Sequence, residues 1–564
     1  MTARVLRFAV AVLLAALAAS ALMQTAATPP EAVTKYLPKG ALLVLETGNF
    51  ESLLGEWNTS SLRTDWFASD NHRALAQSKL YLRLNEARDE LAAAASFEPD
   101  WSLLDAVAGG DSALAVYDIG ELQFLYITRL PEARALETLL WSSRARFEPR
   151  RAGERDYYVR RDEDSGREVA FAAADGTLLL ATAERQLAAA LELFASPDSG
   201  EDSGSVENEP WRREALAEAS ERGEVRLSYN LRGLLATAHF RSYWIQRNAS
   251  RLAEWSSGVS DLRRNESAWR EERILVRAEA AEAPAQADLV LGRLLALVPP
   301  DAGLHRAWAS PETGQTLELL RRKLFDPKPT GYPAYLGSPM QAATGPALET
   351  RIDAAPPPPE TASFRPTPWL SLFAANAPRG LLHVESAYRA PGALLESSST
   401  LIAVLGESEW DEAAVRNTAS ESVAELWTVS GLGLGWSQTG ASWRLDGLAD
   451  VSVAIRGRLL LVSQSPELIN QVVARSAAEP PAQPLVYSAG FRRSREHEPY
   501  RRLMSALDFL QGGGRVPANQ RAPMLFSENL TSISATLSAV DSIEIARRDR
   551  GATVEETATY RLAD

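Results

Sequence analysis

Cysteine is absent from the 564 residues of this chain. Its absence excludes disulfides, thiolate nucleophiles, iron–sulfur clusters and cysteine-based zinc sites, and also the lipid-attachment cysteine of a bacterial lipoprotein. Histidine is scarce, with 5 residues, and the 73 acidic residues outnumber the 59 basic ones. The formal net charge of −14 and the pI near 5.2 argue against a nucleic-acid partner, because phosphate neutralisation needs a basic face.

Several catalytic motifs are also missing from the sequence. No serine lies in Gly-x-Ser-x-Gly, no Ser-x-x-Lys occurs, and no Gly-Lys pair forms a phosphate-binding loop. Gly109-Gly110-Asp111-Ser112 resembles the Gly-Asp-Ser nucleophile of one hydrolase class, but no histidine has the Asp three residues earlier that this class needs. Two glycines between a helix and a strand explain the motif without catalysis. Gly431, Gly433 and Gly435 alternate without forming Gly-x-Gly-x-x-Gly, which favours close packing along a strand.

The N-terminus carries a targeting pattern. Arg4 and Arg7 precede an apolar run, Phe8–Met23, and Ala19-Ser20-Ala21 has the small-x-small form of a cleavage site, with Thr25-Ala26-Ala27 as a weaker one. This run is shorter than the ~20 apolar residues that a membrane-spanning helix needs. We predict a signal peptide over residues 1–27, with an uncleaved anchor as the alternative. The expected location is periplasmic or otherwise extracytoplasmic, soluble or tethered by the N-terminal segment, with no span in the mature chain.

A stretch of the sequence occurs twice. Asp175–Phe194 and Arg456–Ala474 each have a glycine before three leucines, then a polar break and apolar residues at helical spacing. This pattern predicts a tight turn, a buried strand and an amphipathic helix that packs over the strand. Pro38-Lys39-Gly40 and Pro378-Arg379-Gly380 also match as starts of apolar strands, and this second match requires a long insertion in the first copy.

These patterns predict an α+β fold of two tandem related units, each a mainly antiparallel sheet with helices packed on one face. We expect the first unit at 38–281, with a helical insertion about 60–110, and the second at 379–564. A helical and Pro-rich connecting segment at 282–378 separates them. The expected elements include a long Trp-striped helix from about Ser242 to Glu271, a strand at Glu425–Trp436, and a solvated loop at 197–210 whose one apolar residue is Val206. The alternative to duplication is that the same simple packing pattern arose twice independently.

Strands opened by Pro-x-Gly or Pro-Pro-Asp, Gly-Gly before an apolar strand, and the turn–Leu-Leu-Leu–helix units resemble a family of exported bacterial proteins. That family is catalogued only as a domain of unknown function. The resemblance covers both halves and implies an exported, duplicated α+β protein. It implies no activity and no catalytic residues.

Two further features of the sequence resemble binding sites. Glu496-His497-Glu498 is metal-like, but without a second histidine nearby a solvated charged turn is favoured. The many tryptophans suggest stacking on sugars, yet they are scattered, and Trp57, Trp66, Trp101 and Trp141 fall on or near expected helices, where ring burial is ordinary. The sequence therefore assigns no catalytic, cofactor-binding or metal residue.

The function expected from these observations is a binding or scaffold role, without catalysis, in an exported cell-envelope protein. Its partner would be an envelope protein or an apolar or small ligand. Two alternatives stay open. One is a carboxylate-dependent hydrolase acting on envelope material, since a pair of acids leaves little sequence signature. The other is an apolar-ligand carrier with a dry cavity.

Overall fold

The computed structural model describes residues 32–68, 72, 76, 79–98, 100–195, 204–238, 252–265, 267–281, 287–325, 364–388, 397–427, 435–440, 442–446, 451–475, 485–493, 495 and 540–562. The signal-peptide prediction, the Glu496–Glu498 cluster and most of the Pro-rich segment lie outside these residues. Within them, no helix has both the length and the apolar character needed to cross a membrane. The chain forms two compact units: the first unit holds residues up to 52 and 89–213, and the second unit holds 53–88 and 214–564.

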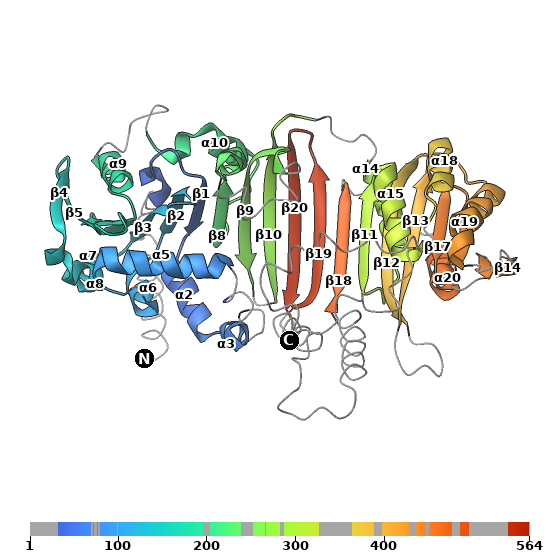
Figure 1. Ribbon diagram of the computed structural model, residues 1–564, viewed down its shortest axis with the longest axis horizontal. Helices are drawn as coiled ribbons and strands as arrows, with labels where there is room; N and C mark the ends of the chain where they lie inside the picture. The colour runs from blue at the N-terminus through green and yellow to red at the C-terminus, as the bar shows by residue number, and fades with distance from the viewer. Residues whose placement is uncertain are drawn as a thin grey trace, which may run out of the picture. The chain divides into compact units, whose positions relative to one another are not determined.

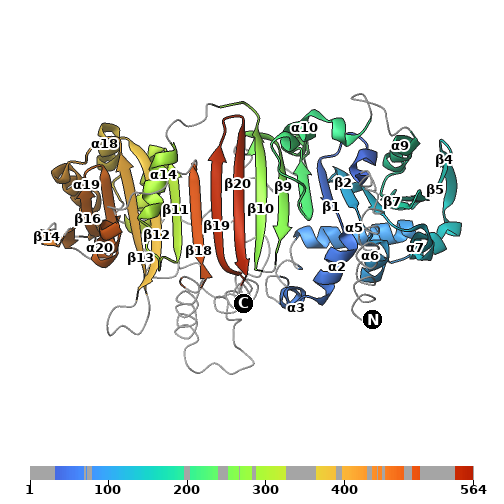
Figure 2. The ribbon, with the colours of Figure 1, turned by 180° about the vertical axis from the view of Figure 1, so that it is seen from behind.

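The first unit is built on an antiparallel sheet with helices on both faces (Figures 1 and 2). The sheet order is β1 (Leu43–Thr47), β2 (Ser112–Asp118), β3 (Gln123–Arg129), β7 (Thr177–Ala181), β6 (Glu168–Ala174), β5 (Arg155–Arg161) and β4 (Glu148–Ala152). One face packs on η1 (Val33–Tyr36) and α9 (Glu184–Ala195). The other packs on the end of α5 (Lys79–Ala95), α6 (Trp101–Val107), α7 (Glu132–Glu137) and α8 (Leu139–Ser142).

The second unit also has one antiparallel sheet (Figures 1 and 2). Its order is β8 (Val225–Tyr229), β9 (Trp255–Arg264), β10 (Ala268–Arg277), β20 (Thr553–Leu562), β19 (Val540–Asp549), β18 (Tyr487–Arg492), β11 (Leu304–Ala309), β12 (Pro378–Tyr388), β13 (Ser397–Gly406), β17 (Leu459–Ser463), β16 (Val451–Arg456), β15 (Ser442–Asp446) and β14 (Gly435–Thr439). One core includes α14 (Ala287–Ala296) and α20 (Pro466–Arg475). The core on the opposite face includes α15 (Thr313–Leu320), η4 (Arg321–Phe325), α18 (Thr367–Ala375) and α19 (Glu412–Trp427).

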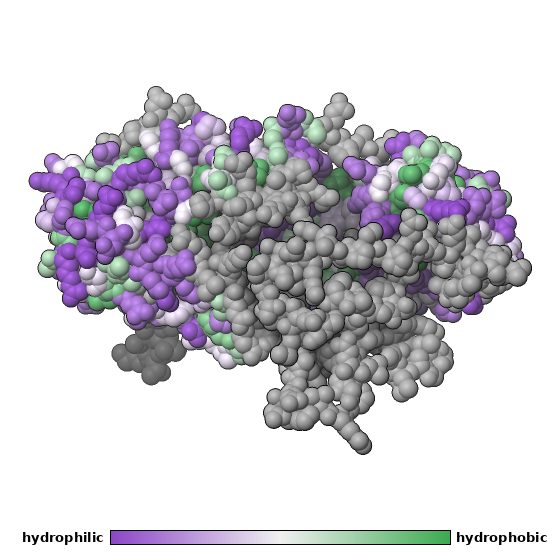
Figure 3. Space-filling model, in the orientation of Figure 1, coloured by the Kyte–Doolittle hydropathy of each residue, from purple (hydrophilic) through white to green (hydrophobic). Residues whose placement is uncertain are grey.

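The remaining helices complete the described elements. They are α2 (Phe50–Thr59), α3 (Ser61–Ala68), η2 (Arg144–Arg146), η3 (Val206–Asn208), α10 (Pro210–Ala217) and α11 (Leu231–Ala236). The described surface on the face seen in Figure 3 is mostly hydrophilic, with hydrophobic residues in small separate groups.

The α+β class is confirmed, but helices pack on both faces of the first sheet and of strands β11–β17 in the second sheet, instead of on one face. The reason is visible in the central strands, where β7 and β17 are buried almost without interruption. A strand that is apolar on both sides needs a covering layer on both sides. The predicted connecting segment at 282–378 also contains β11, which pairs with β12 and β18 inside the sheet of the second unit.

Two sets of seven strands share one order. We call β1–β7 the first module and β11–β17 the second module: the orders β1-β2-β3-β7-β6-β5-β4 and β11-β12-β13-β17-β16-β15-β14 correspond strand by strand. The strands that follow each module also correspond, because β8-β9-β10 and β18-β19-β20 are both antiparallel meanders. This order matches β1 with β11, so the pairing of Pro38–Gly40 with Pro378–Gly380 is wrong and the long insertion is not required.

The two repeated turns show that the sequence alignment of the leucine runs, Leu178 with Leu459, is shifted by one residue. The two turn residues are Asp175-Gly176 in the first module and Gly457-Arg458 in the second, because Ala174 pairs with Thr177 and Arg456 with Leu459. Asp175 and Gly176 both have positive φ, 51° and 67°, whereas only Gly457 does in the second turn, at 54°. Two-residue hairpin turns of both kinds are common. Leu178 therefore corresponds to Leu460. Leu178 lies on the face of its sheet opposite α9, and Leu460 lies on the face of its sheet opposite α20.

Three expected elements differ from the structure. The Trp-striped helix is wrong in its described part, because Trp255–Arg264 and Ala268–Arg277 form the hairpin β9–β10. The expected strand Glu425–Trp436 begins inside α19, which runs to Trp427. Val206, expected in a solvated loop, is fully buried in η3, where its N–H bonds to the carbonyl of Leu37.

Candidate functional site

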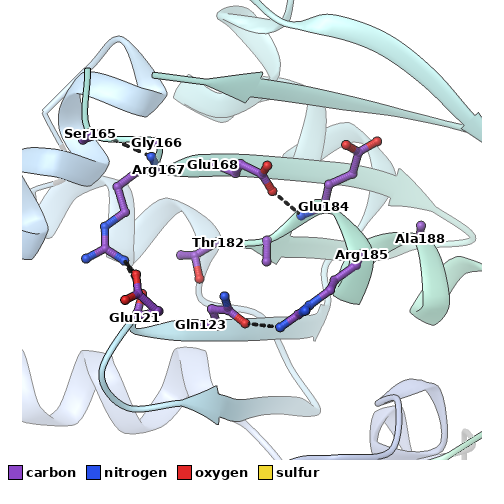
Figure 4. Close-up of a pocket in the computed structure, with 11 residues that line it drawn as sticks. Glu121, Gln123, Ser165, Gly166, Arg167, Glu168, Thr182, Glu184, Arg185 and Ala188 are labelled. Carbon is purple, nitrogen blue, oxygen red and sulfur yellow. Dashed lines mark hydrogen bonds and ion pairs between the residues drawn. The ribbon is translucent and has the colours of Figure 1, made fainter. Parts of the chain in front are cut away.

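A polar pocket of about 570 Å³ opens in the first unit where β7 leads into α9 (Figure 4). We call it pocket A. Its walls come from the start of β3, the turn before β6, the start of β6 and the first turn of α9. The lining residues are Glu121, Gln123, Ser165, Gly166, Arg167, Glu168, Thr182, Ala183, Glu184, Arg185 and Ala188.

Arg167 is fixed on one side of pocket A by contacts to two other parts of the first unit. Its Nε donates to Oε2 of Glu90 in α5 at 2.8 Å, and its terminal nitrogen donates to the backbone carbonyl of Glu121. The Glu121 carboxylate lies 3.5 Å from the same nitrogen. Only 13% of the Arg167 side chain is exposed, so this charge stays in one place.

The opposite side of pocket A joins β3 to the end of β7. The Thr182 hydroxyl donates to the Leu122 carbonyl at 2.9 Å and accepts the Phe124 N–H at 2.9 Å. Arg185 donates to the side-chain oxygen of Gln123 at 2.5 Å (Figure 4). These bonds hold the guanidinium of Arg185 across the pocket from that of Arg167.

The N-terminus of α9 is capped from a neighbouring strand. The residue before the helix is Ala183, whose side chain cannot accept a hydrogen bond. Oε2 of Glu168 on β6 accepts the Glu184 N–H at 3.0 Å instead (Figure 4). A carboxylate at this end of a helix also interacts favourably with the helix dipole.

Glu184 joins pocket A to β4 and β5. Its Oε1 accepts the Tyr157 hydroxyl at 2.7 Å and lies 3.3 Å from a terminal nitrogen of Arg150. Burial raises the pKa of Tyr157 to about 12, and the hydrogen bond and negative charge of Glu184 add to this effect. The tyrosine therefore stays a neutral donor across the physiological range.

Pocket A thus presents two arginines and three glutamates in fixed positions. Hydrogen-bond donors and acceptors on several elements can recognise a polar partner by geometry and charge together. Among the residues that the structure describes, no group of three or more His, Asp or Glu side chains is placed to hold a metal ion.

The structure gives Gly109–Ser112 a packing role. Ser112 is 2% exposed, and its hydroxyl lies 2.6 Å from the Thr128 hydroxyl and 3.0 Å from the Gly110 carbonyl. Asp111 accepts the Val33 N–H at 3.0 Å. A Cβ on Gly109 would lie 2.3 Å from the carbonyl oxygen of Arg129, so only glycine fits there.

None of the other sequence candidates that the structure describes lines pocket A. Glu496–Glu498, Gly431 and Gly433 lie outside the described residues, and Gly435 begins β14. Trp57, Trp66, Trp101 and Trp141 lie on helices, as expected, although Trp101 is 49% exposed. Sequence reasoning passed over Thr182–Arg185 as a polar break. One feature of the sequence could have indicated this site. Ala183, before the expected helix, has no side chain that can cap it, so the first N–H groups of the helix need another acceptor.

Comparisons with known proteins give little support for an identity. No family model and no curated protein matches the chain. Two solved structures of TP0453 are similar to it. Crystal form I has a TM-score of 0.25 at 10% identity, over 43% of this chain and 77% of that one. Crystal form III has a TM-score of 0.23 at 11% identity, over 44% and 80%. Scores at this level establish neither a shared fold nor a function.

Proposed function

We propose that this chain is an exported cell-envelope protein that binds a partner protein through pocket A and performs no catalysis. The observation that carries the proposal is the way the pocket's charges are held. Arg167 is fixed by Glu90 and Glu121, and Glu168 by the N-terminus of α9. Ordering costs of binding are smaller when polar groups are already in position, which suits a recognition surface.

Export and an origin by internal duplication belong to the same proposal. The N-terminal pattern of two arginines, an apolar run and small residues supports export. The common strand order of the two modules supports duplication. The resemblance to exported bacterial proteins of unknown function fits both, and no family model tests it.

A charge reversal at the rim of pocket A tests the binding role. Arg185 is exposed on α9, and Glu192 is exposed on the same helix away from the pocket. We would cross-link the full chain to its neighbours in living cells and compare the native protein with Arg185→Glu and the matched control Glu192→Arg. The expected result is one partner recovered by the native protein and the control, and recovered at least about tenfold less by Arg185→Glu.

Two results would contradict this role. One is equal recovery of every partner by all three proteins. The other is recovery no greater than that of an unrelated exported protein. Circular dichroism checks that each variant folds. Among the described residues the Arg185 side chain bonds to Gln123 in the pocket wall, so its replacement should leave the core intact.

A carboxylate-dependent hydrolase is the alternative proposal, and one observation favours it. Glu121, Glu168 and Glu184 line the same pocket. The test measures release of soluble fragments from isolated cell-wall material by the native protein, Glu168→Gln, Glu184→Gln and the control Glu192→Gln. A general acid or base contributes about 10²–10⁴-fold, so a loss of that size in a pocket variant alone would establish the hydrolase and overturn the binding role.

A further inference from the structure

A second pocket of about 540 Å³, pocket B, lies in the first unit at the opposite end of the hairpin β6–β7 from pocket A. Two of its lining residues, Leu130 and Ala135, are apolar and almost completely buried. The other lining residues are Trp141, Arg155, Asp156, Tyr158, Ala173, Ala174, Asp175, Gly176 and Thr177. This volume falls within the range of small-molecule sites.

One wall of pocket B is aromatic. The rings of Trp141 on α8 and Tyr158 on β5 meet edge to face, with centroids 5.7 Å apart, and Tyr158 stacks on Phe171 at 5.4 Å. Both lining rings are partly exposed. The guanidinium of Arg144 lies 5.2 Å from the centre of the Trp141 ring. A ligand cation would therefore have to compete with a cation already placed there.

The rim of pocket B is polar, with acid and base close to balance. Asp175 accepts from Arg155 at 2.7 Å, while 75% of the Asp156 side chain is exposed, 3.7 Å from Arg151. Arg144 adds a positive charge beside the aromatic wall, so no unbalanced charge favours a ligand ion of either sign. Carboxylates accept hydrogen bonds from hydroxyl groups, and a guanidinium donates to hydroxyl and ring oxygens.

The second module covers its corresponding turn with protein. Trp410 donates its backbone N–H to the Gly457 carbonyl at 3.0 Å and its indole N–H to the Arg458 carbonyl at 2.8 Å. It is 6% exposed and packs in a core with Phe373. In the first module the turn residues Asp175 and Gly176 line pocket B, so an indole occupies one turn and a cavity borders the other.

We propose that pocket B binds a neutral saccharide of one or two hexose units. A sugar combines the features that the pocket needs: an apolar C–H face for the aromatic wall and hydroxyl groups for Asp156, Asp175 and Arg155. Neither sign of charge dominates the rim, which favours a neutral ligand, and Arg144 on Trp141 disfavours an ammonium ligand. The proposal is independent of the partner proposed for pocket A.

The test is isothermal titration calorimetry of the full chain with three neutral sugars, cellobiose, maltose and N,N′-diacetylchitobiose, and with tetramethylammonium as the cationic probe. The main variant is Asp156→Ala/Asp175→Asn, because asparagine tolerates the positive φ at 175 and neither change touches the core. Trp141→Ala removes the aromatic wall, and Trp101→Ala removes an exposed ring of the same unit outside the pocket.

The proposal predicts saturable binding of at least one disaccharide, weakened at least about tenfold by the double variant and by Trp141→Ala. Trp101→Ala and the pocket A variant Arg185→Glu should leave that affinity unchanged. Any of three results overturns it: no disaccharide saturates the folded native protein up to about 10 mM, the double variant binds as the native protein does, or tetramethylammonium binds more tightly than every sugar.

Discussion

The two modules have the same strand order but bury different side chains at equivalent positions. Successive pairings place Glu46, Ala113, Ile127 and Leu179 in one row of the first module. The same row in the second module holds Ala307, Leu382, Ala403 and Leu461. Three of the four positions are apolar in both modules, and the fourth exchanges a buried glutamate for a buried alanine.

This difference shows which part of the sequence determines the fold. The apolar positions are sufficient for the strand order, because both modules adopt it with different polar residues. Glu46 is tolerated because Arg212 reaches it at 2.7 Å and both are at most 3% exposed. The polar groups at the ends of the strands, including both pockets, are features of the first module that the shared order does not require.

The largest predicted effect comes from breaking the buried ion pair of the first unit. Arg212→Met removes the guanidinium that lies 2.7 Å from the buried Glu46 carboxylate and 3.2 Å from Glu207. We expect a loss of about 3–5 kcal/mol in the free energy of unfolding. Glu46→Ala/Arg212→Met, which places the second module's alanine at this position, should recover most of that loss. Urea denaturation measures both, and a double variant no more stable than the single one would contradict the comparison.

Substitution of two glycines, one in each module, compares the stability cost of a Cβ that meets backbone with that of a Cβ that meets side chains. A Cβ at Gly109 would meet the backbone of Arg129, whereas a Cβ at Gly380 would meet Val290 and Leu294 side chains at 2.6 and 2.9 Å. Side chains can move, so we expect Gly109→Ala to cost about 3 kcal/mol and Gly380→Ala about 1 kcal/mol. Gly110→Ala is the control, since its Cβ would lie 3.8 Å from the nearest atom. Thermal unfolding ranks the three, and equal costs at 109 and 110 would refute this explanation.

We expect the stability of the second unit around β11 and β12 to decrease in acid. Burial lowers the pKa of His305 to about 4, with Glu544 raising it and Arg492 lowering it further. Burial alone would raise the pKa of Glu385, but His383, 3.0 Å away, and Lys323, 2.5 Å away, outweigh this and lower it to about 2. Burial also lowers the pKa of His383.

In this region the folded state therefore binds fewer protons than the unfolded state. Stability is fully present above about pH 6.5 and decreases as the pH falls, first through His305 down to about pH 4 and then through Glu385 towards pH 2. We expect a loss on the order of 2 kcal/mol between pH 7 and pH 4. Hydrogen exchange of peptides from β11 and β12 measures it. His305→Gln should reduce the dependence and leave the part that His383 contributes, and an unchanged pH profile in that variant would contradict the assignment.

Part of this architecture is readable from the sequence. The alternation of turn, apolar strand and amphipathic helix predicts the α+β class and both copies of the hairpin–helix unit. The one-residue register between the copies is not readable, because a run such as Leu178–Leu180 stays apolar when it shifts by one position. The hairpin β9–β10 was missed for a similar reason: Trp255, Val259 and Leu262 fit helical spacing, while the pairing with β8 and β20 that makes them strands is nonlocal.

Pocket A could be predicted even less. Its residues lie far apart in the sequence, from Glu121 before β3 to Ala188 in α9, and only the order β3-β7-β6 brings their strands together. Most of them form two short consecutive runs, 165–168 and 182–185, at strand ends, where polar residues are ordinary. Composition and spacing therefore carry no signal that distinguishes Arg167 or Glu168 from other surface charges.

The smallest predicted effect concerns how the two equivalent helices begin. Ser465 caps α20 by accepting the Leu468 N–H at 3.2 Å, whereas Ala183 holds this position before α9 and Glu168 supplies the acceptor. Ser465→Ala should cost about 1 kcal/mol. Ala183→Ser should gain less than that, because Glu168 already satisfies one N–H of the first turn. In the Glu168→Gln background the gain should grow, since a neutral amide interacts less with the helix dipole. Equal gains in both backgrounds, measured by urea denaturation, would show that the Glu168 carboxylate does not act as the cap of α9.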